Sequence, residues 1–371
     1  EMGRRLHLEY WALLNEQLRV GDFFLCASER QRDYWLGSLG ALGRLNHDTW
    51  DGCDFRRLID LVPFGLPAAP PRLERPVLKN LLPHASPQDR VILWGGGLWD
   101  WLDPLTPIKA MQKVRSHHPS ARLLFFDLAR GQTDMAKRAR QLSADLGMLG
   151  REILFVEWVP SEQWGSCLLE ADVGLSFHPA GIETRYAFRT RLLDYIWAGL
   201  PIVTARGDAL SDLVASHDLG YAVRPGDVEG VAAALIAILT EKDARGGRRE
   251  AFRALAAQLT WEQVTEPLSR YCEQPWHAGD AGDSFVRRWK AAEHDRLLAR
   301  AAEAQRRLQE IEARVGQQDE KEDAQIQLAA ISRELAACEA RLQAAMNGRV
   351  MRLMTGLQRA ARRLRDQQAG G

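Results

Sequence analysis

Three arginines cluster where a predicted strand passes into a predicted helix. Arg185, Arg189 and Arg191 follow a Val-Gly-Leu-Ser-Phe-His run and flank the start of the apolar stretch Leu-Leu-Asp-Tyr-Ile-Trp-Ala. Guanidinium groups donate paired hydrogen bonds that fit the oxygens of a diphosphate. Cations are unfavourable at the positive end of a helix dipole unless an anion binds there. The pattern therefore predicts a diphosphate site, with ion pairing to Glu183 and Asp194 as the alternative.

A second candidate is the glycine loop Gly95, Gly96 and Gly97, which follows the apolar run Val-Ile-Leu-Trp. Glycines let the backbone approach a ligand closely, and the N-terminus of the next helix would favour a phosphate. Trp99 and Asp100 come shortly afterwards. A loop exposed to solvent has little reason to hold a tryptophan, so Trp99 adds to the signal. These five residues are predicted to bind a phosphorylated ligand. A tight turn without a ligand is the alternative.

The elements that must position these loops alternate between strand and helix. Short apolar runs predict strands at 91–94, 123–126, 153–156, 173–176, 201–204 and 220–223. Helical patterns lie between or after them at 105–116, 133–147, 161–170, 187–198, 208–216 and 227–240. This alternation predicts an α/β, doubly wound, Rossmann-like domain with a parallel sheet. Ligands bind at the carboxyl ends of the strands in such sheets, where both candidate loops begin.

The order of these motifs resembles the C-terminal domain of GT-B glycosyltransferases, most closely the retaining family-4 type. The glycine loop, the Ser-Phe-His strand end and a helix ending in Trp-Ala-Gly-Leu-Pro-Ile-Val-Thr carry the resemblance over residues 90–272. It implies an enzyme that binds a nucleoside diphosphate sugar. Arg189 and Arg191 would neutralise the departing diphosphate. Glu183, the catalytic candidate, would lie near the sugar and Asp194 near the ribose. No metal or other cofactor is implied.

The sequence departs from that family in its acidic motif. Two glutamates eight positions apart are usual, but Asp194 stands at the second position and Tyr186 at the first. Glu183 would have to substitute for the missing carboxylate. The glycine loop is followed by Asp100 and Asp103 where the family commonly has a basic residue. A non-catalytic scaffold of the same fold is therefore an alternative, and a sugar epimerase is a third interpretation.

Four parts of the chain are predicted. Residues 1–67 would be the remnant of an N-terminal, acceptor-side domain, so the resemblance implies an N-terminally truncated protein. A proline-rich stretch at 68–89 is interpreted as a linker, and residues 90–275 as the nucleotide-sugar domain. The last part, 285–365, shows apolar residues at heptad spacing and predicts an α-helical coiled coil.

The predicted coil has two open interpretations. Residues 316–325 interrupt the apolar seam, so the segment is either an antiparallel hairpin or a coil that joins two copies into a homo-oligomer. Residues 349–365 hold six arginines and an apolar stripe. A basic amphipathic helix of this kind can lie on an anionic membrane surface, and a solvated helix end is the alternative.

Composition excludes some classes of function. The 371 residues include 49 basic and 49 acidic side chains, which argues against a strongly basic nucleic-acid binder. Five scattered cysteines indicate a reducing compartment. The sequence thus predicts a cytoplasmic glycosyltransferase, peripheral at the inner face of the membrane where the basic segment binds. A glycan or lipid-linked acceptor in surface polysaccharide or cell-envelope glycan synthesis is expected.

Overall fold

The computed structural model describes residues 2–52, 54–82, 86, 88–127 and 133–281, with short stretches between 296 and 337. Residues 1–278 form one compact unit. Most of the predicted coiled coil at 285–365, and all of the basic segment at 349–365, lie outside the described residues. Within the described part of the chain, no helix has both the length and the apolar character to cross a membrane.

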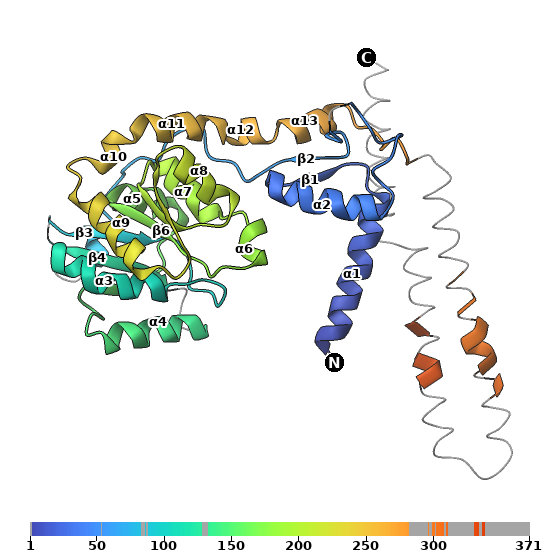
Figure 1. Ribbon diagram of the computed structural model, residues 1–371, viewed down its shortest axis with the longest axis horizontal. Coiled ribbons are helices and arrows are strands. Elements are labelled where there is room, and N and C mark those ends of the chain that lie inside the picture. Colours follow the sequence, from blue (N-terminus) through green and yellow to red (C-terminus); the bar gives the residue numbers. More distant parts are fainter. Residues whose placement is uncertain are drawn as a thin grey trace, which may run out of the picture. The chain divides into compact units, whose positions relative to one another are not determined.

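A six-stranded parallel sheet forms the centre of this unit (Figure 1), in the order β5-β4-β3-β6-β7-β8. Its strands are β3 (Arg90–Trp94), β4 (Ala121–Asp127), β5 (Ile153–Glu157), β6 (Val173–Ser176), β7 (Ile202–Ala205) and β8 (Gly220–Val223). The chain builds outward from β3 to β5 and then returns to add β6 on the other side of β3. The predicted doubly wound sheet is confirmed.

Helices cover both faces of the sheet and enclose two apolar cores. One face carries α3 (Leu105–His117), α4 (Asp134–Asp145) and α9 (Val228–Thr240). The other carries α5 (Ser161–Glu170), α7 (Thr190–Ala198), α8 (Ala209–Ser216) and α11 (Arg249–Gln258), which follows the short α10 (Ala244–Gly247). We call these the α3 face and the α7 face. Central strand side chains are buried because both faces are covered.

The prediction of a single helix at 187–198 is wrong for its first turn. The structure has α6 (Ile182–Tyr186), a break, and then α7. Ala187 turns to extended backbone and its N–H bonds back to the carbonyl of Glu183, which ends α6. Phe188 then packs against the core of the α7 face. The break leaves Arg189 immediately before α7, at its N-cap position.

The N-terminal segment forms a small α/β body of its own elements. It contains α1 (Met2–Val20), β1 (Phe24–Cys26), α2 (Glu29–Ala41) and β2 (Ile59–Leu61), and β1 pairs in parallel with β2. Ser28 caps α2, because its hydroxyl accepts the N–H of Gln31. Strand β2 has only three residues, since residues 54–58 before it form turns.

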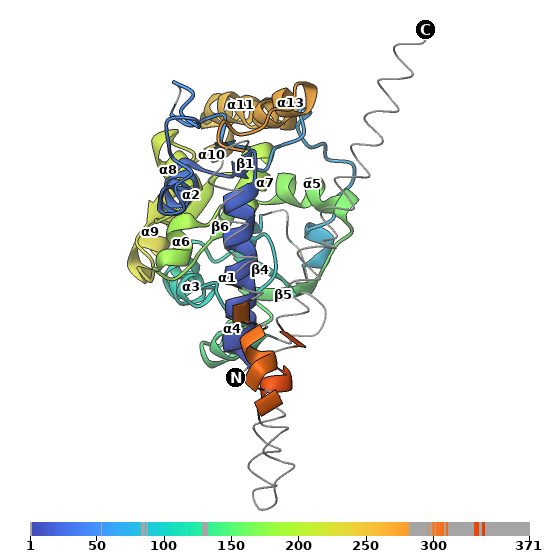
Figure 2. The same cartoon turned by 90° about the vertical axis from the view of Figure 1, so that its right-hand side faces the viewer.

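This segment contacts the carboxyl edge of the large sheet through α2, and both views place α2 beside α6 (Figures 1 and 2). The Gln31 side-chain amide donates to the carbonyl of Tyr186 at 2.8 Å. Arg30 donates to the carbonyl of Gly207 at 2.6 Å and pairs with Asp212. The loops after β6 and β7 are thus held from outside by α2.

The chain passes twice between the two bodies at one place. Leu66 on the outward path and Thr260 on the return path form an isolated parallel bridge, with hydrogen bonds of 2.7 and 3.0 Å. The return path continues through α12 (Trp261–Val264) and α13 (Glu266–Glu273). Tyr271 at the end of α13 stacks on Phe23 beside β1, with ring centroids 5.0 Å apart.

The predicted linker is packed against the sheet in its second half. Val77, Leu78 and Leu82, around the short 3-10 helix η1 (Lys79–Leu81), are buried in the core of the α7 face. The N–H of Val77 also donates to the carboxylate of Glu170 at 2.9 Å. The segment was predicted to be a linker because it is rich in proline. Its three apolar side chains are the reason that it packs in the core instead.

Candidate functional site

The candidate site lies where the strand order reverses. The loops after β3 and β6 diverge at this point, and both open at the carboxyl edge of the sheet. A crevice at such a point is the usual ligand site of an open α/β sheet. The glycine loop follows β3, and His178, Glu183 and Arg189 follow β6. The structure therefore brings the two predicted motifs to neighbouring strands.

Tyr195 of α7 fixes the start of the glycine loop. Its hydroxyl accepts the N–H of Gly95 at 2.7 Å and donates to the carbonyl of Leu175 at 2.9 Å. The side chain is fully buried, and burial raises the pKa of its hydroxyl. A Cβ on Gly95 would lie 2.8 Å from that hydroxyl, so the site requires glycine there. Sequence reasoning missed this role of Tyr195, which reads as an ordinary core residue of the helix.

Arg191 reaches the glycine loop from the first turn of α7. Its Nη2 lies 3.5 Å from the carbonyl of Gly97, and its guanidinium stacks 4.8 Å from the ring centroid of Trp94. Gly96 has φ +132°, and a Cβ there would lie 2.7 Å from Nη2 of Arg191. Arg191 and the glycine loop are therefore in contact, which the sequence predicted only as a shared function.

The guanidinium of Arg191 is held in a low-dielectric position without a countercharge in contact. The structure gives it no ion pair among the described residues, and its Nη1 is buried without a hydrogen-bond partner. Burial lowers the pKa of Arg191, and the neighbouring Arg189 lowers it further, although Tyr195 and Asp194 act in the opposite direction. The predicted ion pair with Asp194 is thus not formed within bonding distance. An anion at this place would supply the missing partner.

Arg189 is also buried but has one carboxylate partner. Its Nη2 donates to Glu183 at 2.9 Å, the ion pair that the alternative interpretation anticipated. The Glu183 side chain is 62% exposed, whereas that of Arg189 is 9% exposed. Nε of Arg189 is buried and unpartnered within the described structure. Arg185, the third arginine of the motif, instead lies 5.7 Å from the ring centroid of Tyr186.

His178 and Asp208 complete the buried polar group. His178 follows β6, is 2% exposed, and its Nδ1 has no partner among the residues that the structure describes. Burial, followed by Arg189 and Arg191, lowers the pKa of His178 to about 3, so the ring is neutral. Asp208 caps α8 through Oδ1, while its Oδ2 is buried and unpaired. The signal for His178 in the sequence was a polar residue directly after a buried strand.

Asp194 lies on the α7 face of the site. Its Oδ2 accepts the indole N–H of Trp164 at 3.0 Å. Burial raises the pKa of Asp194, whereas the bond from Trp164 and the charge of Arg191 act to lower it. Trp164 stacks on Trp158, which follows β5, with ring centroids 6.0 Å apart. The predicted ribose carboxylate thus lies beside an aromatic pair.

Asp100 and Trp99, predicted to contact the donor, have partners within the fold. Oδ1 of Asp100 accepts the N–H of Met135 at 2.9 Å at the start of α4. Trp99 stacks on Trp101, with ring centroids 5.4 Å apart and an interplanar angle of 2°. Donor contact by these two residues stays a prediction.

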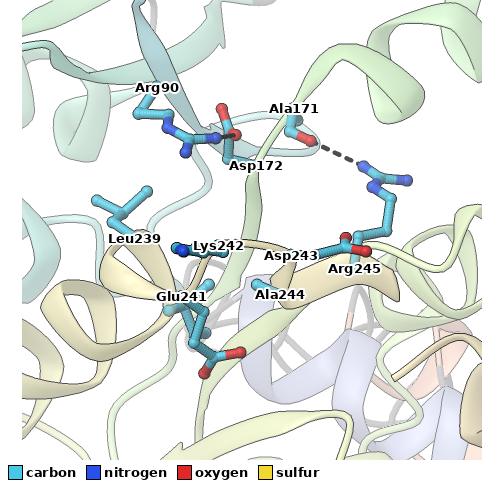
Figure 3. Close-up of a pocket in the computed structure, with 10 residues that line it drawn as sticks. Arg90, Ala171, Asp172, Leu239, Glu241, Lys242, Asp243, Ala244 and Arg245 are labelled. Atoms are coloured by element: carbon cyan, nitrogen blue, oxygen red, sulfur yellow. Dashed lines mark hydrogen bonds and ion pairs between the residues drawn. The ribbon is translucent and has the colours of Figure 1, made fainter. Parts of the chain in front are cut away.

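A hollow at the amino edge of the sheet contrasts with this site (Figure 3). Arg90 there pairs with Asp172 at 2.7 Å, and Arg245 donates to the carbonyls of Ala171, Leu168 and Ala198. None of the buried unpartnered side-chain atoms found in the described residues belongs to its lining. The hollow therefore lacks the unsatisfied groups that mark the switch point.

Over the part of the chain that the structure describes, no group of three or more His, Cys, Asp or Glu side chains is arranged to hold a metal ion. Beside the glycine loop the described positive charges are those of Arg189 and Arg191, and Glu183 pairs with Arg189.

Part of the chain that contains this site is similar in sequence to known proteins. Residues 89–241 match the family described as glycosyl transferases group 1. A phosphatidyl-myo-inositol mannosyltransferase of Mycolicibacterium smegmatis is 27% identical over 172 residues, which is 46% of this chain and 42% of that protein.

Two solved structures resemble the fold. Anabaena Alr3699/HepE in complex with UDP and glucose has a TM-score of 0.53 at 15% identity, over 71% of this chain and 66% of that one. The trehalose-6-phosphate protein from E. coli bound with UDP-2-fluoro glucose has a TM-score of 0.53 at 18% identity, over 72% and 64%. The present chain spans less than two thirds of the length of all three relatives. Residues 89–241 are therefore similar to the glycosyl transferases group 1 family, and the chain has a GT-B-like fold.

Proposed function

We propose that this chain binds a nucleoside diphosphate sugar at the switch point and transfers the sugar to a hydroxyl group of an acceptor. One observation carries the proposal. Arg189, which is buried, and Arg191, which is partly buried, lie at the N-terminus of α7 beside the glycine loop, and each has a buried N–H group without a partner in the described structure. Buried cations in such a position are unfavourable until an anion joins them.

A diphosphate fits these groups in charge and in hydrogen bonding. Arg191 would donate to it from the glycine loop side and Arg189 from the side of β6. Negative charge grows on the diphosphate as the glycosidic bond to it breaks. Fixed cations in a site of low dielectric constant stabilise that charge without further rearrangement.

The two carboxylates would then contact the ends of the donor. Asp194, on the α7 face, would accept hydrogen bonds from ribose hydroxyl groups, and its bond from Trp164 would hold the carboxylate in orientation. Glu183 would lie near the sugar. Because Glu183 pairs with Arg189 in the unliganded protein, the diphosphate would compete for Arg189 and free the carboxylate. The neighbours bound to UDP and glucose, or to UDP-2-fluoro glucose, support a donor of this class.

The acceptor and the location are proposed at a coarser level. A hydroxyl group of a cell-envelope glycan or of a lipid-linked acceptor is favoured. The name of the mannosyltransferase among the relatives includes a lipid, phosphatidyl-myo-inositol. A cytoplasmic protein at the inner face of the membrane would have access to such an acceptor. The arginine-rich stripe at 349–365 supports this location.

Isothermal calorimetry with UDP, GDP and dTDP, and with sugars linked to each, tests the proposal. Arg189→Ala and Arg191→Ala should each weaken binding of the nucleotide that the wild type prefers. Arg90→Ala is the matched control, because Arg90 begins strand β3 at the amino edge while the glycine loop follows the same strand at the other edge. If the folded wild type binds none of these nucleotides, the donor proposal fails and a non-catalytic scaffold replaces it.

A further inference from the structure

We propose that Trp99 and Trp101 form a stacking platform for a sugar ring of the glycan acceptor, a role that replaces the donor contact predicted for Trp99 from the sequence. The inference rests on the proposed function, because it concerns the second substrate of the same site. The two indoles, called the indole pair below, are 41% and 54% exposed and lie on the loop after β3. Exposed aromatic pairs next to a ligand crevice are unusual on a protein surface and mark binding sites.

The indole pair is held in place by the loop that carries it. Leu98 and Leu102, on either side of the pair, are each 4% exposed and belong to the core of the α3 face. Thr133 donates to the carbonyl of Leu98 at 2.5 Å, and the N–H of Leu102 donates to the carbonyl of Trp99 at 3.0 Å. The loop is therefore ordered before any ligand arrives, and binding would cost little conformational entropy.

The position of the indole pair distinguishes between the two ends of a bound donor. Asp194 and Trp164, which would hold the ribose, belong to the α7 face of the sheet. Leu98 and Leu102, which flank the indole pair, belong to the core of the α3 face, and the glycine loop that precedes the pair contacts Arg191. A donor with its ribose at Asp194 would thus direct its base away from the pair and its sugar end toward it.

The chemistry of the indole pair suits a pyranose ring. One face of many pyranoses carries several C–H groups, and this apolar face packs on the electron-rich face of an indole. The two indole planes are parallel within 2°, so their outer surfaces present flat areas of matching orientation. Glu183 is proposed for the transferred sugar and follows β6 rather than β3. The indole pair would therefore bind the sugar of the acceptor that adjoins the transferred sugar.

Saturation-transfer NMR with mannotriose, maltotriose and cellotriose tests this assignment. The wild type should saturate the ring C–H protons of at least one trisaccharide, and Trp99→Ala/Trp101→Ala should lose that signal or bind about tenfold more weakly. Trp99→Phe/Trp101→Phe should retain part of it. Trp50→Ala is the matched control, since Trp50 is also 54% exposed but packs on Phe55 in the N-terminal segment.

Calorimetry with UDP and GDP separates this inference from the proposed function. The alanine double variant should bind the free nucleotide as the wild type does. Loss of nucleotide affinity in a folded double variant would place the indole pair in the donor site and overturn the acceptor assignment. Unchanged trisaccharide signals in the double variant, or no signal in the wild type, would overturn it as well, while the nucleotide result stands on its own.

Discussion

Replacing Arg191 with methionine should stabilise the unliganded protein and weaken nucleotide binding at the same time. Methionine keeps an unbranched stem but removes the charge. In the unliganded fold the guanidinium has a buried Nη1 without a partner, faces Arg189 and sits in the first turn of α7. Removing such a charge relieves a desolvation cost of several kcal/mol and an unfavourable dipole contribution of about 0.3–1 kcal/mol.

Two losses oppose this gain. The stacking of the guanidinium on Trp94 at 4.8 Å contributes about 0.5–2 kcal/mol. The contact with the carbonyl of Gly97 is long, at 3.5 Å, and contributes little. We therefore expect the free energy of unfolding to rise by about 1–3 kcal/mol, which corresponds to roughly 2–4 °C in the melting temperature for each kcal/mol.

Binding should change in the opposite direction. Loss of one partner of a buried charge pair typically costs about 2–5 kcal/mol, or about 30-fold to several thousand-fold in Kd. Scanning fluorimetry and calorimetry with the preferred nucleotide measure the two effects on the same sample. Arg90→Met, at the exposed start of β3, should change neither quantity appreciably. A lower melting temperature together with unchanged nucleotide affinity would refute the reasoning.

Three further outcomes are expected. Tyr195→Phe leaves the N–H of Gly95 without its partner, so it should lower the free energy of unfolding by about 1–3 kcal/mol and weaken nucleotide binding, as urea unfolding and calorimetry would show; equal stability would contradict the role. His178 has a folded pKa of about 3 against an ordinary value of 6.5, so the stability it contributes above pH 6.5 is lost as the pH falls toward 3. His178→Gln should flatten that dependence by about 2 kcal/mol between pH 7 and pH 5, and parallel pH profiles would exclude the effect. Arg245→Met removes bonds to the carbonyls of Ala198, Leu168 and Ala171, and should lower the free energy of unfolding by about 2–4 kcal/mol without changing the nucleotide Kd; a changed Kd would show that the amino edge is coupled to the site.

The sheet and its loops follow from local patterns in the sequence. Short apolar runs separated by helical stretches predict parallel strands, and the rule for doubly wound sheets then places the loops after 94 and 176 at one edge. The break between α6 and α7 could not be predicted in this way. Ala187 and Phe188 continue the apolar pattern of the predicted helix, and the break before Arg189 depends on Phe188 packing against the core.

The contacts that define the site could not be predicted from the sequence for a related reason. Tyr195 and Gly95 are 100 positions apart, and their bond depends on the depth at which α7 packs against β3 and β6. The unpartnered Nη1 of Arg191 is likewise a property of burial, which the type and spacing of residues do not reveal. Residue types and spacing indicated the glycine loop and the arginines but not Tyr195, and the tertiary packing determines which of their polar groups have hydrogen-bond partners.

The bridge between Leu66 and Thr260 makes the six-stranded domain an insertion with a single neck. Both chain passages run in parallel through that neck and are joined by two backbone hydrogen bonds. Residues 67–259 therefore begin and end side by side, as the ends of an inserted cassette must. Recombination at this neck would exchange one nucleotide-binding cassette for another without rerouting either strand of the small N-terminal sheet. The contacts made by Arg30, Gln31 and Tyr34 would then have to be matched to the new loops.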